Sequence, residues 1–290
     1  MLKIFLSLLL LFSISYSWDS FSKSKRELRK IYRDHQTTIY CDCKYNYKKK
    51  KNMIDRSSCG YIPRNEYTKK GKINIRARRI EWEHVIPAEN FGRQFKCWRE
   101  GNEQCVNSKG KKYKGRRCCT KVNKQYREMQ ADMHNLFPAI GELNADRKNY
   151  RFDFSGPTPG QYGQCKFNVN FKKRRAYVDE SKRGVIARDY LYFHDKYGMK
   201  ISDQEMKKFE AWDVMYPPSD WEKERNERIK LIQGNENPYI NWWLFLTIIN
   251  GSSEMKEFLF RLSTIISIIK RDAIFQKNNF IWIWITVSDN

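Results

Sequence analysis

Eight cysteines constrain this chain more than any other feature of its sequence, because each pairing would join two separate segments covalently. They form an even set: Cys41, Cys43, Cys59, Cys97, Cys105, Cys118, Cys119 and Cys165. Neither the pair at 41 and 43 nor the adjacent pair at 118 and 119 has the gap typical of a zinc knuckle. We therefore expect disulfides rather than a zinc site, with a connectivity that spacing alone does not determine.

The N-terminus indicates a compartment in which disulfides persist. Lys3 precedes a mostly apolar run at 4–12, and small serines follow at Ser13, Ser15 and Ser17. The run is too short to span a bilayer, and the serines fit the positions before a cleavage site, so we expect residues 1–17 to be a signal peptide. The alternative is an N-terminal core helix. Export to the periplasm or the medium would allow the cysteines to pair.

Charge indicates the kind of partner. The 290 residues carry a formal net charge of +23, which favours a polyanion such as nucleic acid or an anionic surface. Basic clusters with interleaved aromatic residues at 45–51, 109–117 and 172–177 would contact phosphates without reading bases. The alternative for these clusters is a solvated basic face. With 40% apolar residues, the chain has enough material for a packed core of one or two domains.

Periodicity and capping signals predict a mixture of short elements. The expected elements are a helix beginning at the capping-box sequence 24–27, β-structure at 37–41 and 79–83, and helices at 184–197 and from Ser202 to before Pro217. A basic region at 48–72 is typical of loops. This mixture, with its long cysteine-rich loops, favours an α+β fold over an alternating α/β fold.

The composition changes at the C-terminal end of the chain. Residues 241–290 contain patches rich in Trp, Phe and Ile, interrupted by charges. No patch reaches the roughly 18 to 20 apolar residues that a membrane helix needs, so we expect no membrane span. We treat 241–290 as a hydrophobic extension that packs on the domain, contacts a membrane or partner, or is poorly specified.

Two segments carry the candidate chemistry. The first is 79–88, where Glu83 and His84 place a carboxylate beside an imidazole. On a regular strand these side chains would face opposite ways, so both can serve one site only where the strand ends, and Pro87 indicates such an end. The second is 132–147, which is dense in amides and carboxylates. Taken alone, the first pair is often a surface coincidence, and Asn144 could be a polar residue on a short helix.

Together these segments resemble the endonuclease I family of bacterial periplasmic and secreted nucleases. The family signatures Glu-Trp-Glu-His-Val and Gly-Glu-x-Asn-x-Asp-Arg stand at 81–85 and 141–147, and the resemblance covers roughly 18–240. It implies a single disulfide-bridged nuclease domain with a ββα-metal (His-Me finger) fold, acting as a monomer. It also implies hydrolysis of DNA, and of RNA through the same phosphate contacts, with little sequence preference.

The resemblance also implies residue roles. The residue matching His84 acts as general base, and those matching Glu83 and Asn144 hold one divalent ion, Mg²⁺ or another such as Mn²⁺ or Ca²⁺. These types suit the chemistry, because imidazole accepts a proton near neutral pH and Mg²⁺ prefers oxygen ligands. Asn135 is the second choice of amide.

A cation should assist the phosphate. The family's catalytic arginine follows a glycine, and here the sequence at 115–117 is Gly-Arg-Arg. We choose Arg116 for bidentate phosphate contact, with Arg117 as the alternative. Many relatives carry a glutamate where Gln130 stands, and since an amide cannot donate a carboxylic proton, we leave Gln130 out of the catalytic set. For His134 we favour a structural role.

Two rival functions use the same composition. A catalytically silent cationic protein could bind extracellular nucleic acid or an anionic envelope, since it needs only basicity and export. The intact set of Glu83, His84 and Asn144 argues against it. A zinc-stabilised binding module is disfavoured by the cysteine spacings.

Overall fold

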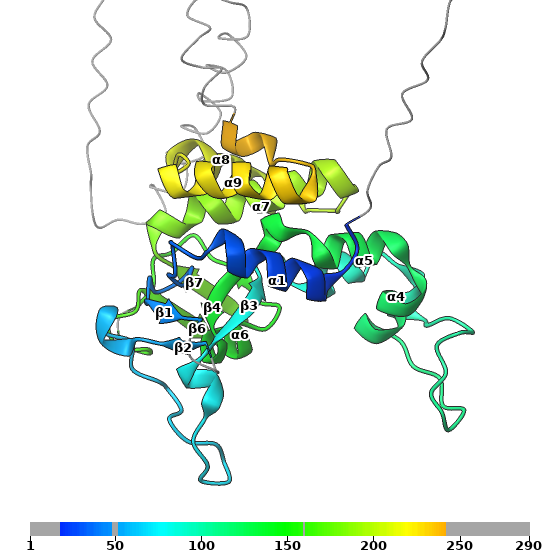
Figure 1. Cartoon of the computed structure of the whole chain (residues 1–290), viewed down its shortest axis with the longest axis horizontal. Coiled ribbons are helices and arrows are strands. Elements are labelled where there is room, and N and C mark those ends of the chain that lie inside the picture. Colours follow the sequence, from blue (N-terminus) through cyan, green and yellow to red (C-terminus); the bar gives the residue numbers. More distant parts are fainter. Residues whose placement is uncertain (1–17, 48–51, 159, 242–290) are drawn as a thin grey trace, which may run out of the picture. The chain divides into compact units, whose positions relative to one another are not determined.

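A computed structural model describes residues 18–47, 52–158 and 160–241 (Figure 1). The expected signal peptide at 1–17 lies outside the described residues, as does all of the expected extension at 241–290 except Asn241. Within the described ranges, no helix combines the length and the apolar character needed to cross a membrane.

The described residues form an α+β structure, as predicted. The helices are α1 (Phe21–Ile31), α2 (Ala88–Gly92), α3 (Lys96–Arg99), α4 (Arg116–Val122), α5 (Lys124–Ala131), α6 (Gly141–Arg147), α7 (Glu180–Tyr197), α8 (Asp203–Met215) and α9 (Asp220–Gln233). The strands are β1 (Tyr45–Asn46), β2 (Met53–Ile54), β3 (Ile80–His84), β4 (Leu136–Ile140), β5 (Arg151–Phe152), β6 (Phe167–Asn170) and β7 (Arg175–Val178). They pair as β1-β2, β3-β4 and β5-β7-β6, with only the β5-β7 pair parallel.

The antiparallel strand pair β3-β4, with α6 directly after β4, positions the site. Its register runs from Ile80 opposite Ile140 to His84 opposite Leu136. All five residues of β4 are buried, and α6 begins directly after it at Gly141. A Cβ atom on Gly141 would lie 2.9 Å from the Arg76 carbonyl oxygen, so the close approach at the start of α6 requires glycine.

Helices α7, α8 and α9 lie together on one side of the strands (Figure 1). The guanidinium of Arg188 on α7 is buried and contacts Asp213 of α8 at 3.1 Å and Glu222 of α9 at 2.6 Å. The predicted end of α7 at Gly198 is confirmed, because this glycine adopts a φ of 62°. The predicted cap Ser202 is also confirmed, since its side chain accepts from the Glu205 amide.

Two local predictions were wrong because tertiary contacts override local signals. In place of a strand at 37–41, Thr37 forms an isolated bridge with Lys44, residues 39–41 form a turn, and the Ile39 amide donates to the Pro138 carbonyl of β4. The first helix begins at Phe21 with Ser20 as its cap, so Ser24 lies inside it. There the Ser24 hydroxyl accepts from Trp18 Nε1 at 2.7 Å and donates to the Ala131 carbonyl.

All eight cysteines form disulfides, which confirms that prediction and contradicts the zinc-stabilised module. The pairs are Cys41–Cys165, Cys43–Cys59, Cys97–Cys119 and Cys105–Cys118. The first two tie the turn after α1 to the region before β6 and to the loop after β2. The last two lie within the insertion that separates β3 from β4.

The disulfides differ in the length of chain that they close, and this difference predicts unequal stabilisation. Cys41–Cys165 spans 124 residues and Cys43–Cys59 spans 16. In the chain-entropy model the longer loop stabilises by about 1 to 2 kcal/mol more. Replacing each pair with alanines and measuring urea unfolding should therefore show the larger loss for the 41–165 variant. An equal or smaller loss for that variant would contradict the expectation.

Candidate active site

A cavity of about 640 Å³ lies where β3 ends. It brings together Glu83 and His84 from β3, Arg116 from the start of α4 and Asn144 from α6. The four residues predicted from separate parts of the sequence therefore share one site. The remaining lining residues are Phe21, Lys25, Arg29, Asn52, Arg79, Ile80, Glu81, Trp82, Pro87, Ala88 and Lys148.

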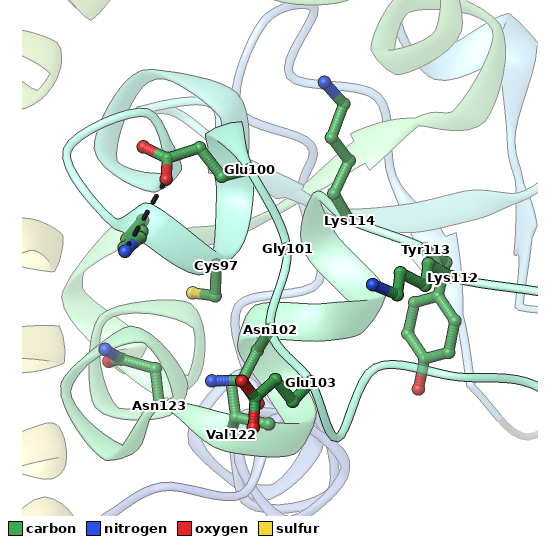
Figure 2. Close-up of a pocket in the computed structure, with 11 residues that line it drawn as sticks. Cys97, Glu100, Gly101, Asn102, Glu103, Lys112, Tyr113, Lys114, Val122 and Asn123 are labelled. Carbon is green, nitrogen blue, oxygen red and sulfur yellow. Dashed lines mark ion pairs between the residues drawn. The ribbon is translucent and has the colours of Figure 1, made fainter.

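A slightly larger cavity of about 670 Å³ lies in the disulfide-bonded insertion (Figure 2). Figure 2 shows its acidic and basic side chains, including Glu100, Glu103, Lys112 and Lys114. Its lining contains no histidine and no residue of β3 or α6. We therefore place the candidate chemistry in the cavity at the end of β3.

His84 is the last residue of β3, and its side chain is almost buried, with 8% exposure. Its Nε2 lies 2.9 Å from the Gln130 carbonyl oxygen, and since a carbonyl only accepts, we assign the proton to Nε2. The lone pair is then on Nδ1. Burial, aided by the charge of Arg116, lowers the pKa of His84 from 6.5 to about 3. The ring is therefore a neutral proton acceptor at neutral pH.

Glu83 is buried with one oxygen held in place. Its Oε1 accepts from the Tyr40 hydroxyl at 3.1 Å and from Arg147 Nη1 at 3.2 Å. Burial raises the pKa of Glu83 to about 7, although Arg147 and Tyr40 both act to lower it. Both contacts described for this carboxylate are on Oε1, which leaves Oε2 for a ligand in the cavity.

Arg147, at the end of α6, fixes the backbone where β3 ends. It is fully buried and donates to the His84 carbonyl at 3.0 Å and to the Val85 carbonyl at 2.5 Å. Sequence reasoning included Arg147 in a signature but gave it no role. These bonds fix the backbone at the end of β3, where Glu83 and His84 both line the cavity.

Asn135 was the second choice of amide for a metal, and the structure contradicts that choice. Its Oδ1 accepts from the Ile86 amide at 2.6 Å, and its Nδ2 donates to the Ile86 carbonyl at 3.0 Å. Both polar atoms of the side chain are therefore used, and Asn135 does not line the cavity. Its contacts instead fix the chain just beyond β3.

Asn144 is oriented by a residue that sequence reasoning missed. Its Nδ2 donates to Glu81 Oε2 at 3.3 Å, which leaves the amide oxygen available to a ligand. Glu81 is in turn held by Arg76 at 2.9 Å and Arg79 at 3.2 Å. A signal was present, because residues two apart on a strand, such as Glu81 and Glu83, share a face.

Arg116 lies at the first position of α4, after Gly115 with its φ of 79°. One orientation of the Gln130 side-chain amide gives both of its polar atoms suitable partners. In this orientation its oxygen accepts from Arg116 Nη2 at 2.9 Å and Nε at 3.1 Å, and its nitrogen donates to Thr120. Gln130 therefore contacts Arg116 through its side chain and His84 through its carbonyl. Arg117 instead lies over the Tyr113 ring, outside the cavity lining.

Helix α1 contributes three lining residues that its amphipathic pattern did not reveal. The Phe21 ring lies 5.0 Å from the His84 ring, and Arg116 lies 5.4 Å from the same phenyl ring. Lys25 and Arg29 add positive charge to the cavity. Burial, with the neighbouring charges of Arg29 and Arg116, lowers the pKa of Lys25.

His134 lies outside the cavity lining, which agrees with the structural role favoured for it. Its ring is fully buried, with Nε2 3.2 Å from the Asn235 carbonyl oxygen and the Tyr192 ring at 5.0 Å. These contacts join the segment before β4 to the segment after α9.

Comparison with known proteins finds relatives that match the part of the chain containing this cavity. The family described as Endonuclease I matches residues 20–242. An extracellular deoxyribonuclease of Aeromonas hydrophila is 46% identical over 231 residues, covering 79% of this chain and 92% of that protein. A periplasmic deoxyribonuclease of the same organism is 46% identical, covering 76% and 85%. Endonuclease-1 of Buchnera aphidicola subsp. Acyrthosiphon pisum is 38% identical, covering 77% and 80%.

The environment of His84 predicts an unusual titration. Because burial and Arg116 lower its pKa to about 3, the ring should stay neutral down to about pH 4. NMR titration of the metal-free protein should show this, with His84→Gln used to assign the ring signals. A midpoint near 6.5 would mean that the ring is solvated rather than buried.

Proposed function

This chain belongs to the endonuclease I family, and on that premise we propose that it is a secreted or periplasmic nuclease that hydrolyses DNA with His84, Glu83, Asn144 and Arg116. The observation that carries the proposal is that these four side chains line one cavity. Since β3 and β4 form an antiparallel pair and α6 follows β4 directly, we assign a ββα-metal (His-Me finger) fold. The proposed nuclease domain is residues 18–240, between a signal peptide at 1–17 and an extension at 241–290.

His84 is the proposed general base. The bond from Nε2 to the Gln130 carbonyl holds the ring and leaves Nδ1 able to take a proton from water. Because its pKa is lowered, the ring is not already protonated at neutral pH. A silent cationic binder would have no use for a buried neutral imidazole at the centre of a basic cavity, so this arrangement favours the nuclease over that rival.

Glu83 and Asn144 are the proposed ligands of one divalent ion. Glu83 and Asn144 line the same cavity, and hard oxygen atoms suit Mg²⁺, Mn²⁺ or Ca²⁺. The raised pKa of Glu83 also fits, since burial disfavours the ionised carboxylate and a bound cation would favour it. When bound, such an ion would stabilise the charge that develops on the phosphate and the leaving oxygen.

Arg116 is the proposed phosphate contact, and Gln130 is its positioning residue. The planar guanidinium suits bidentate contact with phosphate oxygens, and Gln130 fixes its orientation through Nε and Nη2. Lys25 and Arg29 add positive charge to the cavity, which attracts the neighbouring phosphates of the nucleic-acid backbone. Since Gln130 cannot supply a carboxylic proton, water protonates the leaving oxygen.

These contacts address the nucleic-acid backbone rather than the bases. Cationic side chains recognise phosphates without sequence information, so the monomeric enzyme should cut with little sequence preference. The same contacts accept RNA as well as DNA.

Replacing His84 with alanine should abolish cleavage while DNA binding persists, because the imidazole transfers a proton and contributes little affinity. Loss of a general base typically lowers the rate about a hundred- to ten-thousand-fold. Plasmid digestion gives the rate and fluorescence anisotropy the binding, with His35→Ala as a control outside the cavity. A rate within about tenfold of wild type would exclude His84 as the base.

The metal demand, meaning the Mg²⁺ concentration for half-maximal activity, should distinguish the proposed metal ligands from the proposed phosphate contact. Glu83→Gln removes the negative charge of one ligand and Asn144→Ala removes the other ligand oxygen, so both should raise the Mg²⁺ concentration for half-maximal activity. Arg116→Ala should instead lower turnover at saturating Mg²⁺ with little change in metal demand. Cleavage titrated against Mg²⁺ measures both quantities.

Circular dichroism should confirm that each variant is folded, since Glu83 is also bonded to Arg147. An unchanged metal demand in folded Asn144→Ala would remove Asn144 from the ligand set. A raised metal demand in Arg116→Ala would instead place that arginine with the metal-binding groups.

A further inference from the structure

A second basic cavity, of about 450 Å³, lies next to the catalytic one. Four separate segments line it: the end of α2, the chain after α6, the β6-β7 turn and the α7-α8 connection. Its lining includes a single carboxylate, Glu205, and six cationic side chains: Arg93, Arg151, Lys173, Arg174, Arg175 and Lys200. A polar cavity with such an excess of positive charge favours a polyanion.

Three of the six cations are available for a ligand. Lys173, Arg174 and Lys200 are exposed and form no ion pair with any residue that the structure describes. By contrast, Arg175 contacts Asp153 at 3.6 Å and Arg151 contacts Glu205 at 4.0 Å. The cavity therefore holds positive charge that its own carboxylate does not neutralise.

The C-terminus of α6 connects the two cavities. Lys148 lines the catalytic cavity, and the next residues, Asn149 and Tyr150, line the second one. The buried ring of Tyr150 lies between cations from both: its centroid is 5.7 Å from Lys148 Nζ and 5.7 Å from Arg174 Cζ. Arg174 Nη2 is also 3.5 Å from Asn149 Oδ1, which ties the β6-β7 turn to the same corner.

We propose that this second cavity binds backbone phosphates of the same DNA strand whose scissile phosphate lies in the catalytic cavity. A strand carries one charge for about every 3.4 Å of helix axis, so a backbone leaving the catalytic cavity past Lys148 brings further phosphates to Arg174 and Lys200. Tyr150 is buried and forms the floor between them, so the contacts are to phosphate rather than to a stacked base. The inference rests on the proposed nuclease function and extends its substrate site.

The test removes two cations of the second cavity without touching the catalytic one. Arg174→Gln/Lys200→Gln is compared with Lys223→Gln/Lys230→Gln, which removes the same charge from exposed positions on α9 that line neither cavity. Binding of a fluorescent duplex in the presence of chelator is measured across salt concentrations. Cleavage is then measured on that duplex and on a dinucleotide too short to reach both cavities.

For the Arg174/Lys200 variant, the slope of log K against log salt should become shallower by about 2, since each lost phosphate contact removes about one unit. The advantage in kcat/KM of the duplex over the dinucleotide should also shrink, mainly through KM. An unchanged slope, or an equal change in the α9 control, would overturn the proposal. If the wild type binds duplex but cleaves neither substrate, the nuclease function fails while the salt slope still tests the second cavity.

Discussion

The buried contact between Arg147 and Glu83 is the interaction on which the rest of the site depends. One guanidinium reaches the Glu83 carboxylate and the carbonyls of His84 and Val85, and so joins the end of α6 to the end of β3. Removing one partner of such a buried pair typically costs about 3 to 5 kcal/mol, because the other charge is left uncompensated. Asn144 lies one helical turn before Arg147, so the contact between Arg147 and Glu83 also fixes the distance between the two proposed metal ligands.

Burial at the end of β3 moves the pKa values of Glu83 and His84 in opposite directions. It raises the pKa of Glu83 to about 7 and lowers that of His84 to about 3, so both changes favour the uncharged form. In the proposed mechanism this suits His84, which must be neutral to accept a proton. It also means that a cation binding beside Glu83 competes with a proton, which couples metal affinity to pH.

What the sequence could predict depended on whether the deciding contacts were local. The end of α7 at Gly198 and the cap of α8 at Ser202 follow from a few adjacent residues, and both were found. Glu83, His84 and Asn144 were chosen because two ordered family signatures contain them, and Arg116 because it follows a glycine as the family's arginine does; one cavity brings the four together. Spacing could place Glu81 on the same face as Glu83, but not its contact with Asn144 or the contribution of Lys25 and Arg29 from α1, because these depend on how distant elements pack.

The insertion between β3 and β4 explains why the cysteines matter to the site as well as to stability. The β3-β4 pair and α6 carry Glu83, His84 and Asn144, but Arg116 and Gln130 belong to the inserted helices. Two of the four disulfides, Cys97–Cys119 and Cys105–Cys118, attach α4 immediately beside Arg116. Gln130 then contacts both Arg116 and His84, so a displacement of the insertion would disturb the phosphate contact and the base together. The two cross-links therefore stabilise the insertion that carries Arg116, while the contacts of Gln130 join that insertion to His84.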